Sequence, residues 1–439
     1  MLKNFRSFFA ATLISRILGY VRDLAIAYFV GGGYWADIYF ASFRITNLFR
    51  RLVGEGGLYA AYTPVYSSIL AKDKDSAKAF AHAYAGKLIL VLVPLIAAGM
   101  ILAGPLTAAL LPGFHGDPER ILWAERLTRI LLPFLLFVTL AAWAQATLQA
   151  HGRFFISSLS PALASAAIIL YLATQGDPGA RHDRMPAIIT GLAWATLAGG
   201  ILQYACLIPQ LAATIGNFTR KNLSGSHPEL KKSLKLLGPY MFIFALDQVN
   251  SFLDTFFGSW AQEGAITALY NSNRLIQLPL GLIGVGALAT TLPEFAKNVA
   301  AKESHKIRAP MYKGIKMIAL LQVPAALAYI FLGAAIVRLL YNHGRFDLAA
   351  SNLTAEVLAC AAPSLVFYSL QKIFISIFYA HQDVKSIVKV SALQLAVNSV
   401  GCALLVTSHG AQGIAMMSSI SSFLGLSLLA YTATKKKYY

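Results

Sequence analysis

Residues 131–154 read LLPFLLFVTLAAWAQATLQAHGRF, and residues 361–384 read AAPSLVFYSLQKIFISIFYAHQDV. The two stretches align without a gap at an offset of 230, that is, 361 minus 131. Matched positions include Pro133 with Pro363, Phe137 with Phe367, Ala150 with Ala380, and His151 with His381. At the same offset, ASFR at 41–44 meets NSNR at 271–274. Because two separate regions share one offset, the sequence predicts an internal repeat.

The composition predicts an integral membrane protein. Of 439 residues, 57% are hydrophobic and 13% are charged, and the mean hydropathy is +0.60, whereas soluble domains carry about 25% charged residues. A membrane-crossing helix needs about 20 apolar residues, and roughly twelve such segments follow one another. They lie near 7–30, 34–70, 86–112, 121–149, 155–175, 186–213, 236–260, 264–293, 314–340, 353–380, 386–408 and 411–433.

The offset of 230 aligns the first predicted span with the seventh and the fourth with the tenth. The predicted fold is therefore an all-α polytopic membrane protein with about 12 transmembrane helices in two six-helix lobes. An even number of spans per lobe makes the repeat parallel, a pseudo-twofold about an axis along the membrane normal. We expect an N-terminal lobe at 1–213, a basic linker at 214–235 and a C-terminal lobe at 236–439.

The formal charge of +18 could suggest a nucleic-acid partner, but the basic residues alternate by loop. One set of loops holds most of them, including Lys72, Lys74, Lys78, Arg153, Lys231, Lys232, Lys235, Lys297, Lys385 and Lys435. This asymmetry predicts that these loops and both termini are cytoplasmic and that no nucleic acid is bound. The basic, apolar N-terminus resembles a signal peptide, but it lacks a small-residue cleavage site, so we expect a retained first span.

Arginines inside predicted spans are the feature that points to a ligand. The first, second and eighth spans contain Arg16, Arg22, Arg44, Arg50, Arg51 and Arg274. Each arginine at a helix centre costs about 2.5–3.5 kcal/mol on insertion scales. A single one can be explained by an ion pair or by snorkelling to the interface. The first two spans offer only Asp23, Asp37 and Glu55 against five arginines, so the set predicts a cationic cavity for a phosphate or diphosphate.

Other features bear on the mechanism. The run LVGEGGLYAAYTP at 52–64 interrupts the second span, as happens where backbone lines a cavity. Asp247, Asn250 and Asp254 form one polar stripe on the seventh span, which suits either a coupling cation or hydrogen bonds between helices. The three cysteines have no metal-site spacing. Neither a P-loop nor a His-Glu-x-x-His motif occurs, so we predict a transporter without an enzymatic or ATP-driven step and without a bound cofactor.

Several motifs resemble the MurJ/MviN family of lipid II flippases, which belongs to the multidrug/oligosaccharidyl-lipid/polysaccharide exporter superfamily. They are SRILGYVRD (15–23), NLFRRLVGEGGLYAAYTPV (47–65), LYNSNRLIQLPLGLIGVGALATTLPEFAK (269–297) and FYAHQDVKSIVK (378–389). The resemblance covers nearly the whole chain. It implies that lipid II, a membrane lipid carrying a peptidoglycan precursor, moves from the inner to the outer leaflet of the bacterial cytoplasmic membrane by alternating access. The resemblance also suggests that the protein associates with cell-wall synthesis proteins.

The resemblance implies roles for individual residues. Arg16, Arg22, Arg50 and Arg274 would bind the diphosphate and sugar head group. Asp23, Asp37, Arg44, Arg51 and Glu55 are candidates for gating or for the cavity wall. A sodium site of the family would map to Asp254, Asp383 and Ser399, with sodium or a proton as the coupling cation.

The sequence departs from the family pattern at three places. The usual Pro-Asn-Leu is Thr46-Asn47-Leu48, and the usual Lys-Thr-Pro is Lys385-Ser386-Ile387. Typical members have fourteen spans, the last two contributing to a groove for the lipid tail, whereas twelve are counted here. Alternatives are a flippase for another polyprenyl-diphosphate-linked glycan, a cation-coupled drug antiporter of the same superfamily, or a membrane scaffold without transport activity.

Overall fold

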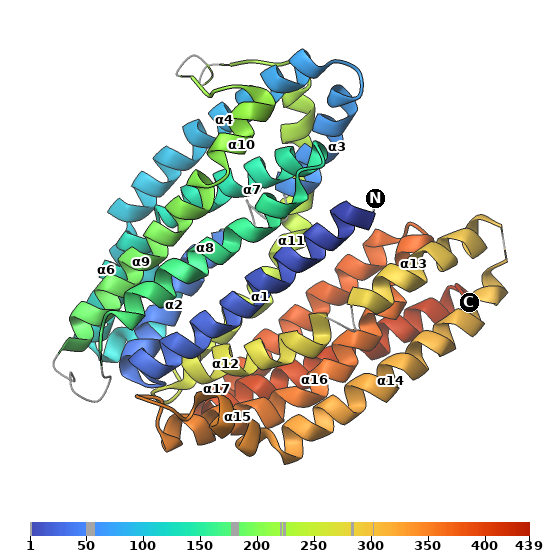
Figure 1. Ribbon diagram of the computed structural model, residues 1–439. Helices are drawn as coiled ribbons and strands as arrows, with labels where there is room; N and C mark the ends of the chain where they lie inside the picture. The colour runs from blue at the N-terminus through green and yellow to red at the C-terminus, as the bar shows by residue number, and fades with distance from the viewer. Residues whose placement is uncertain are drawn as a thin grey trace. The chain divides into compact units, whose positions relative to one another are not determined.

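A computed structural model describes residues 2–49, 58–176, 184–219, 222, 225–281, 285–301 and 303–439. All regular structure in these ranges is helical, as Figure 1 shows. The all-α fold class is therefore confirmed.

The first half of the chain runs from α1 to α10. Its helices are α1 (Leu2–Val30), α2 (Tyr34–Phe49), α3 (Tyr59–Leu70), α4 (Lys74–Ile101), α5 (Ala103–Leu110), η2 (Pro112–Gly116), α6 (Pro118–Leu131), α7 (Phe134–Ala150), α8 (Phe154–Ala173), α9 (Met185–Ala205) and α10 (Ile208–Ile215). Helix α8 packs against both α1 and α9 (Figure 1).

The second half runs from α11 to α17. Its helices are α11 (Leu230–Gly258), α12 (Ala265–Pro279), α13 (Val285–Ala300), η7 (Ser304–Ile307), α14 (Arg308–Phe331), α15 (Gly333–Tyr341), α16 (Leu348–Ala380) and α17 (Val384–Lys435). Gly410 interrupts the long α17 with φ 53° and ψ −134°, a left-handed conformation that glycine adopts readily. This break separates the predicted eleventh and twelfth spans.

The described helices coincide with all twelve predicted segments. Some segments are one helix, such as α1 and α8, and others are two consecutive helices, such as α6 with α7 or α14 with α15. By length and composition alone, seven stretches of the described chain qualify as membrane spans, the 52-residue α17 counting as one of them.

The repeat recurs in the helix boundaries. At the offset of 230, helix ends and starts pair as Leu70 with Ala300, Ile101 with Phe331, Ala103 with Gly333, Pro118 with Leu348, Ala150 with Ala380, and Phe154 with Val384. The left-handed residues Gly152 (φ 76°) and Gln382 (φ 55°) follow the paired histidines at the same offset. The two halves therefore share one helical plan. The corner between the fourth and fifth predicted spans recurs between the tenth and eleventh.

The repeat also preserves a helix cap. Asp117 precedes α6 and accepts hydrogen bonds from the backbone N–H groups of Glu119 and Arg120 at 3.1 and 3.0 Å. Asp347 precedes α16 and accepts from Ala350 N at 2.8 Å. Both carboxylates thus satisfy donors of the first helical turn.

We predict that Asp117→Ala and Asp347→Ala each lower the free energy of unfolding by about 1 kcal/mol, because each removes an N-cap. Thermal unfolding of the purified protein in detergent would measure the loss. Asparagine is an equally good cap, so Asp117→Asn and Asp347→Asn should stay within a few tenths of a kcal/mol of wild type. Equal losses in the Ala and Asn variants would contradict the capping role.

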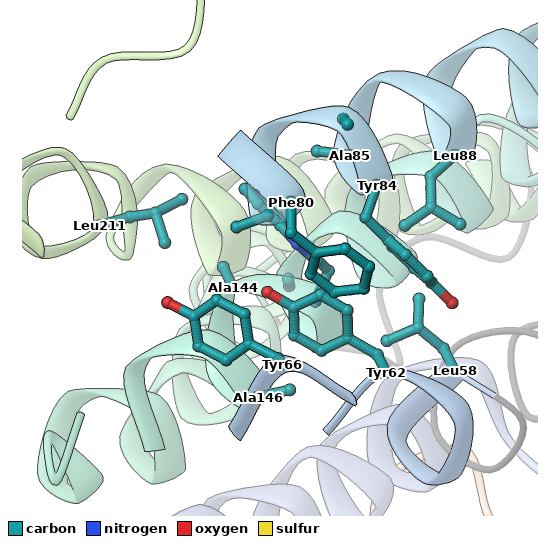
Figure 2. Close-up of a cluster of buried hydrophobic side chains, with 14 of the residues drawn as sticks. Leu58, Tyr62, Tyr66, Phe80, Tyr84, Ala85, Leu88, Ala144, Ala146 and Leu211 are labelled. Atoms are coloured by element: carbon teal, nitrogen blue, oxygen red, sulfur yellow. The ribbon is translucent and has the colours of Figure 1, made fainter. Parts of the chain in front are cut away.

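By packing, the chain divides into two units, one formed by Met1–Gly31 with Ile38–Phe252 and the other by Gly32–Asp37 with Leu253–Tyr439. An aromatic core in the first unit stacks Tyr62 on Tyr66 and on Phe80, with ring centroids 5.1 and 5.7 Å apart (Figure 2). Part of the segment expected as a linker packs on this unit, because His227 Nε2 bonds Ser76 Oγ at 3.0 Å and Ser233 donates to Ala61 O at 2.9 Å.

Candidate functional site

Helix α1 carries two of the predicted binding arginines. Arg16 is exposed. Arg22 donates to Asp23 through Nε at 3.0 Å and Nη2 at 2.6 Å, and the Asp23 side chain is fully buried. Adjacent helical residues point about 100° apart, yet the long arginine side chain reaches back to its neighbour. Asp23 therefore holds the Arg22 guanidinium in a fixed position.

Two paired serines set the rotation of the helices that carry Arg44 and Arg274. Ser42 on α2 donates to Ala124 O of α6 at 3.0 Å. Ser272 on α12, its repeat partner, donates to Thr354 O of α16 at 2.9 Å. The acceptors are also 230 residues apart, so the two helix pairs make the same contact in the two halves.

The arginines two residues beyond these serines are both half-buried. Arg44 donates to Ser251 Oγ at 3.0 Å within the first unit. Arg274 lies on α12, one turn before the helix ends at Pro279. A guanidinium keeps its charge at any physiological pH and offers several N–H donors, so each position carries a permanently cationic donor group.

Asp37 joins the first turn of α2 to the first turn of α12. Its Oδ2 accepts from Gly264 N at 2.8 Å, and its Oδ1 accepts from Thr267 N at 2.9 Å and Thr267 Oγ1 at 2.7 Å. In return, Glu263 Oε1 accepts from Tyr34 N at 2.8 Å. Asp37 of α2 thus caps the start of α12, and Glu263, two residues before α12, accepts from the first residue of α2. Asp37 itself is 1% exposed.

Three candidate residues, Arg50, Arg51 and Glu55, lie outside the described residues, as does the side chain of Asp247. Their roles stay predictions from the resemblance. The described part of the predicted site therefore comprises Arg16, Arg22, Asp23, Arg44, Asp37 and Arg274.

Two of the three candidates for the sodium site, Asp383 and Ser399, lie far apart along the fold. Asp383 precedes α17 and Ser399 lies within it, and sixteen residues at 1.5 Å each separate them by about 24 Å along the helix. Ser399 donates to Leu395 O of its own helix at 2.8 Å. Hard cations need oxygen ligands within about 2.6 Å, so one ion cannot contact both side chains.

A buried polar cluster near Asp254 was not foreseen from the sequence. Asn398 is fully buried, and its Oδ1 accepts from Ser421 Oγ at 3.4 Å and lies 3.8 Å from Cys402 Sγ. Asp254 interacts electrostatically with Cys402. The described residues contain no group of three or more His, Cys, Asp or Glu side chains placed for a metal, but carboxylate, amide and hydroxyl oxygens here suit a hard cation. The sequence signal that could have revealed this cluster is the presence of Asn398 and Ser421 in otherwise apolar predicted spans.

Comparison with known sequences identifies the family. The profile described as "Lipid II flippase MurJ" matches residues 26–439. The chain belongs to the MurJ family. The match includes α2 and α12 entirely and begins within α1, after Arg22.

Individual MurJ-family proteins align over nearly the full chain. A "Probable lipid II flippase MurJ" of Rhizobium tropici is 32% identical over 443 residues, covering 99% of this chain and 81% of the relative. That of Haemophilus influenzae is 32% identical over 448 residues, covering 98% and 85%. A "Lipid II flippase MurJ" of Burkholderia cenocepacia is 29% identical, covering 97% and 82%.

Solved structures share the fold. "Lipid II flippase MurJ, inward closed conformation" superposes with a TM-score of 0.81 at 24% identity, covering 98% of this chain and 88% of that one. A multidrug resistance MATE family transporter of the MOP superfamily, in an inward-facing conformation, gives 0.75 at 16% identity, covering 96% and 95%. At these identities the similarity concerns the fold, which the MurJ family shares with drug transporters.

Proposed function

We infer that this chain is a lipid II flippase, which moves the undecaprenyl-diphosphate-linked peptidoglycan precursor from the inner to the outer leaflet. The observation that carries this conclusion is the MurJ-family match over residues 26–439. The half-buried or paired arginines on α1, α2 and α12 support it, because they supply cationic donors in apolar helices to an anionic head group.

We propose the following mechanism. The head group enters a cavity walled by Arg16, Arg22, Arg50 and Arg274, while the polyprenyl tail stays in lipid. The two lobes then rock about the bound head group by alternating access. Transmembrane potential contributes about 2.3 kcal/mol per charge per 100 mV. With a negative interior, both the outward movement of an anion and the inward return of the cationic empty carrier are favoured.

The same proposal includes the orientation of the chain in the membrane, the coupling cation and the association with other proteins. Both termini would face the cytoplasm of a bacterial cell, with the chain in its inner membrane. A coupling cation, sodium or a proton, would use Asp254. Association with cell-wall synthesis proteins stays a prediction of the resemblance.

The experiment that tests the function is complementation in bacteria depleted of their own lipid II flippase. We expect the full-length chain to restore growth and cell shape, and lysis despite normal abundance in the membrane would contradict the proposal. Cells that instead lack a flippase for another polyprenyl-diphosphate glycan, such as an O-antigen unit, serve as the matched comparison. Rescue of those cells alone would assign the chain to the other glycan.

The fold shared with MATE transporters supports a second candidate, a cation-coupled drug antiporter. The chain covers 95% of that transporter's length against 88% of the solved MurJ structure. A carrier of cationic drugs needs acidic groups in its cavity, whereas α1, α2 and α12 carry arginines. Sodium-dependent uptake of a cationic dye into vesicles would favour this candidate over the flippase.

A further inference from the structure

In both halves, the residue two positions after the paired histidine reaches the last helical segment of its half. Arg153 follows His151, and its Nη1 donates to Gln210 O of α10 at 3.0 Å. Asp383 follows His381 at the equivalent repeat position, and its Oδ2 accepts from Lys436 Nζ at 2.5 Å, just after α17 ends. The same corner is thus bonded to a later segment in both halves. In the N-terminal half the bond joins the Arg153 guanidinium to a backbone carbonyl, and in the C-terminal half it is the ion pair of Asp383 with Lys436.

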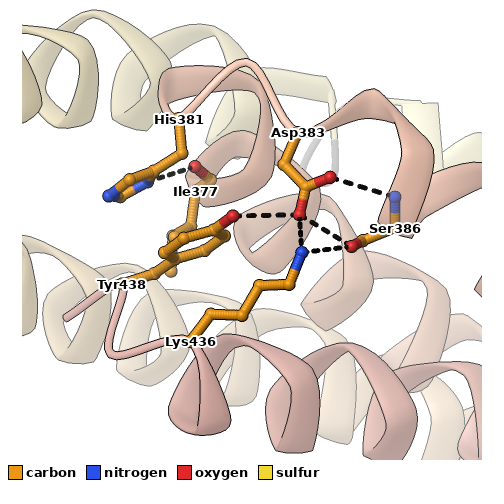
Figure 3. A network of polar contacts seen from close by, with 6 residues as sticks. All are labelled: Ile377, His381, Asp383, Ser386, Lys436 and Tyr438. Carbon is orange, nitrogen blue, oxygen red and sulfur yellow. Dashed lines mark hydrogen bonds and ion pairs between the residues drawn. The ribbon is translucent and has the colours of Figure 1, made fainter.

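In the C-terminal half, two residues of the segment after α17, Lys436 and Tyr438, contact this corner (Figure 3). Tyr438 donates its hydroxyl to Asp383 Oδ2 at 2.9 Å, and its ring stacks on His381 with centroids 4.0 Å apart and planes 10° apart. Its edge also meets Phe378 at 5.4 Å. Lys436 Nζ donates a second bond, to Ser386 Oγ at 2.9 Å.

Asp383 has two separable tasks at this corner. Its Oδ1 caps α17 by accepting from Ser386 N at 3.1 Å, while its Oδ2 receives Lys436, Tyr438 and the Ser386 hydroxyl. The Asp383 side chain is 13% exposed and that of Lys436 is 42% exposed. Ions in solution therefore reach the lysine, and salt can screen the pair.

Opposing effects act on the Asp383 carboxyl. Burial alone raises its pKa, but the hydrogen bonds from Lys436, Ser386 and Tyr438 together lower the pKa well below its ordinary value. A carboxylate with a depressed pKa stabilises the folded state above the ordinary pKa of about 4, and that stabilisation is lost only as the pH falls through the folded pKa. The contact is therefore expected to persist unchanged between pH 5 and pH 8.

We propose that residues 436–439 form a salt-sensitive latch, which holds the end of α17 against the corner at 381–386. In the N-terminal half, Arg153 makes the corresponding contact between its corner and α10. The latch joins the start of the eleventh span to the end of the twelfth. The latch residues lie outside α1, α2 and α12, the helices that carry the described arginines of the candidate site. The latch would form whichever lipid the protein transports.

Hydrogen exchange of the full-length protein in lipid nanodiscs tests the latch directly. The N–H groups of Lys436, Lys437 and Tyr438 bond to the carbonyls of Thr432, Thr434 and Ala433 at 3.0 to 3.1 Å, so their exchange reports whether the segment is fastened. Asp383→Asn keeps an N-cap oxygen for Ser386 but removes the charge. We expect roughly tenfold or faster exchange at 436–438 in this variant, with normal exchange in α10.

Three matched measurements make the result decisive. Arg153→Ala should speed exchange in α10 only. The charge-swapped Asp383→Lys, Lys436→Asp double variant should restore part of the protection at 436–438, because it restores the ion pair but leaves Ser386 N and the Tyr438 hydroxyl without their acceptor. About 1 M salt should speed tail exchange in the wild type and leave Asp383→Asn unchanged. Should Asp383→Asn fail to fold, Lys436→Met, at a side chain that is 42% exposed, tests the same pair. Unchanged tail exchange in a folded Asp383→Asn or Lys436→Met variant, or no response of the wild type to salt, would overturn the latch.

Discussion

The Arg274→Ala variant is expected to bind the diphosphate-linked lipid about 10- to 100-fold more weakly than the wild-type chain. Hydrogen bonds to charged groups contribute about 1.5–3 kcal/mol each, and about 1.4 kcal/mol corresponds to a factor of ten. Because Arg274 lies on α12, whose rotation Ser272 sets through its bond to Thr354 O, loss of the side chain should leave the helix in place. Binding of a labelled diphosphate lipid to the purified protein in nanodiscs would measure the effect.

Two control variants separate charge from geometry at this position. Arg274→Lys keeps the charge but loses the planar fork, so we expect an intermediate loss of affinity. Ser272→Ala leaves the arginine intact but removes the bond to α16, and a smaller loss should follow. Wild-type affinity in Arg274→Ala would remove Arg274 from the binding site.

The Asp37→Ala variant is expected to lower the free energy of unfolding by about 2–4 kcal/mol and to abolish complementation. The substitution removes an N-cap, worth about 1–2 kcal/mol, and leaves a second buried N–H without its acceptor. The affected donors, Gly264 N and Thr267 N, begin the helix that carries Arg274. Thermal unfolding together with growth of depleted cells would measure both effects.

Glu263 offers the matched control for Asp37. Glu263→Gln retains an oxygen that accepts from Tyr34 N, so stability and growth should stay near wild type. Thr267→Val removes only the hydroxyl bond to Asp37 and should cost about 1 kcal/mol. An Asp37→Ala variant as stable and as active as wild type would contradict the capping role.

The helices were predictable from the sequence because apolar length and an internal offset are local, additive signals. The twelve segments and the offset of 230 anticipated the helix boundaries, including the paired corners at 150 and 380. The break at Gly410 was also visible, as the gap between the last two predicted spans. Helix pairs within one predicted span, such as α6 with α7, were not separated, because hydropathy does not register a single turn of irregular backbone.

Contacts between distant residues were not predictable in the same way. Asp37 was selected as an important acid, but its bonds to Gly264 and Thr267 depend on how the first turns of α2 and α12 meet. The pairing of Arg22 with Asp23 depends on a side-chain conformation that the angle between neighbours does not determine. Asp383 was assigned to a cation, whereas the structure shows its carboxylate bound by Lys436 and Tyr438, which approach from the other end of α17.

The most direct test of the central claim measures lipid II in the outer leaflet of bacteria depleted of their own flippase. An externally added, membrane-impermeant probe would report how much lipid II is accessible when the wild-type chain or Arg274→Ala is present at equal abundance. We expect the wild type to restore accessible lipid II and the variant to leave most of it inside. Equal accessibility with wild type, with Arg274→Ala and with no added chain would contradict the account.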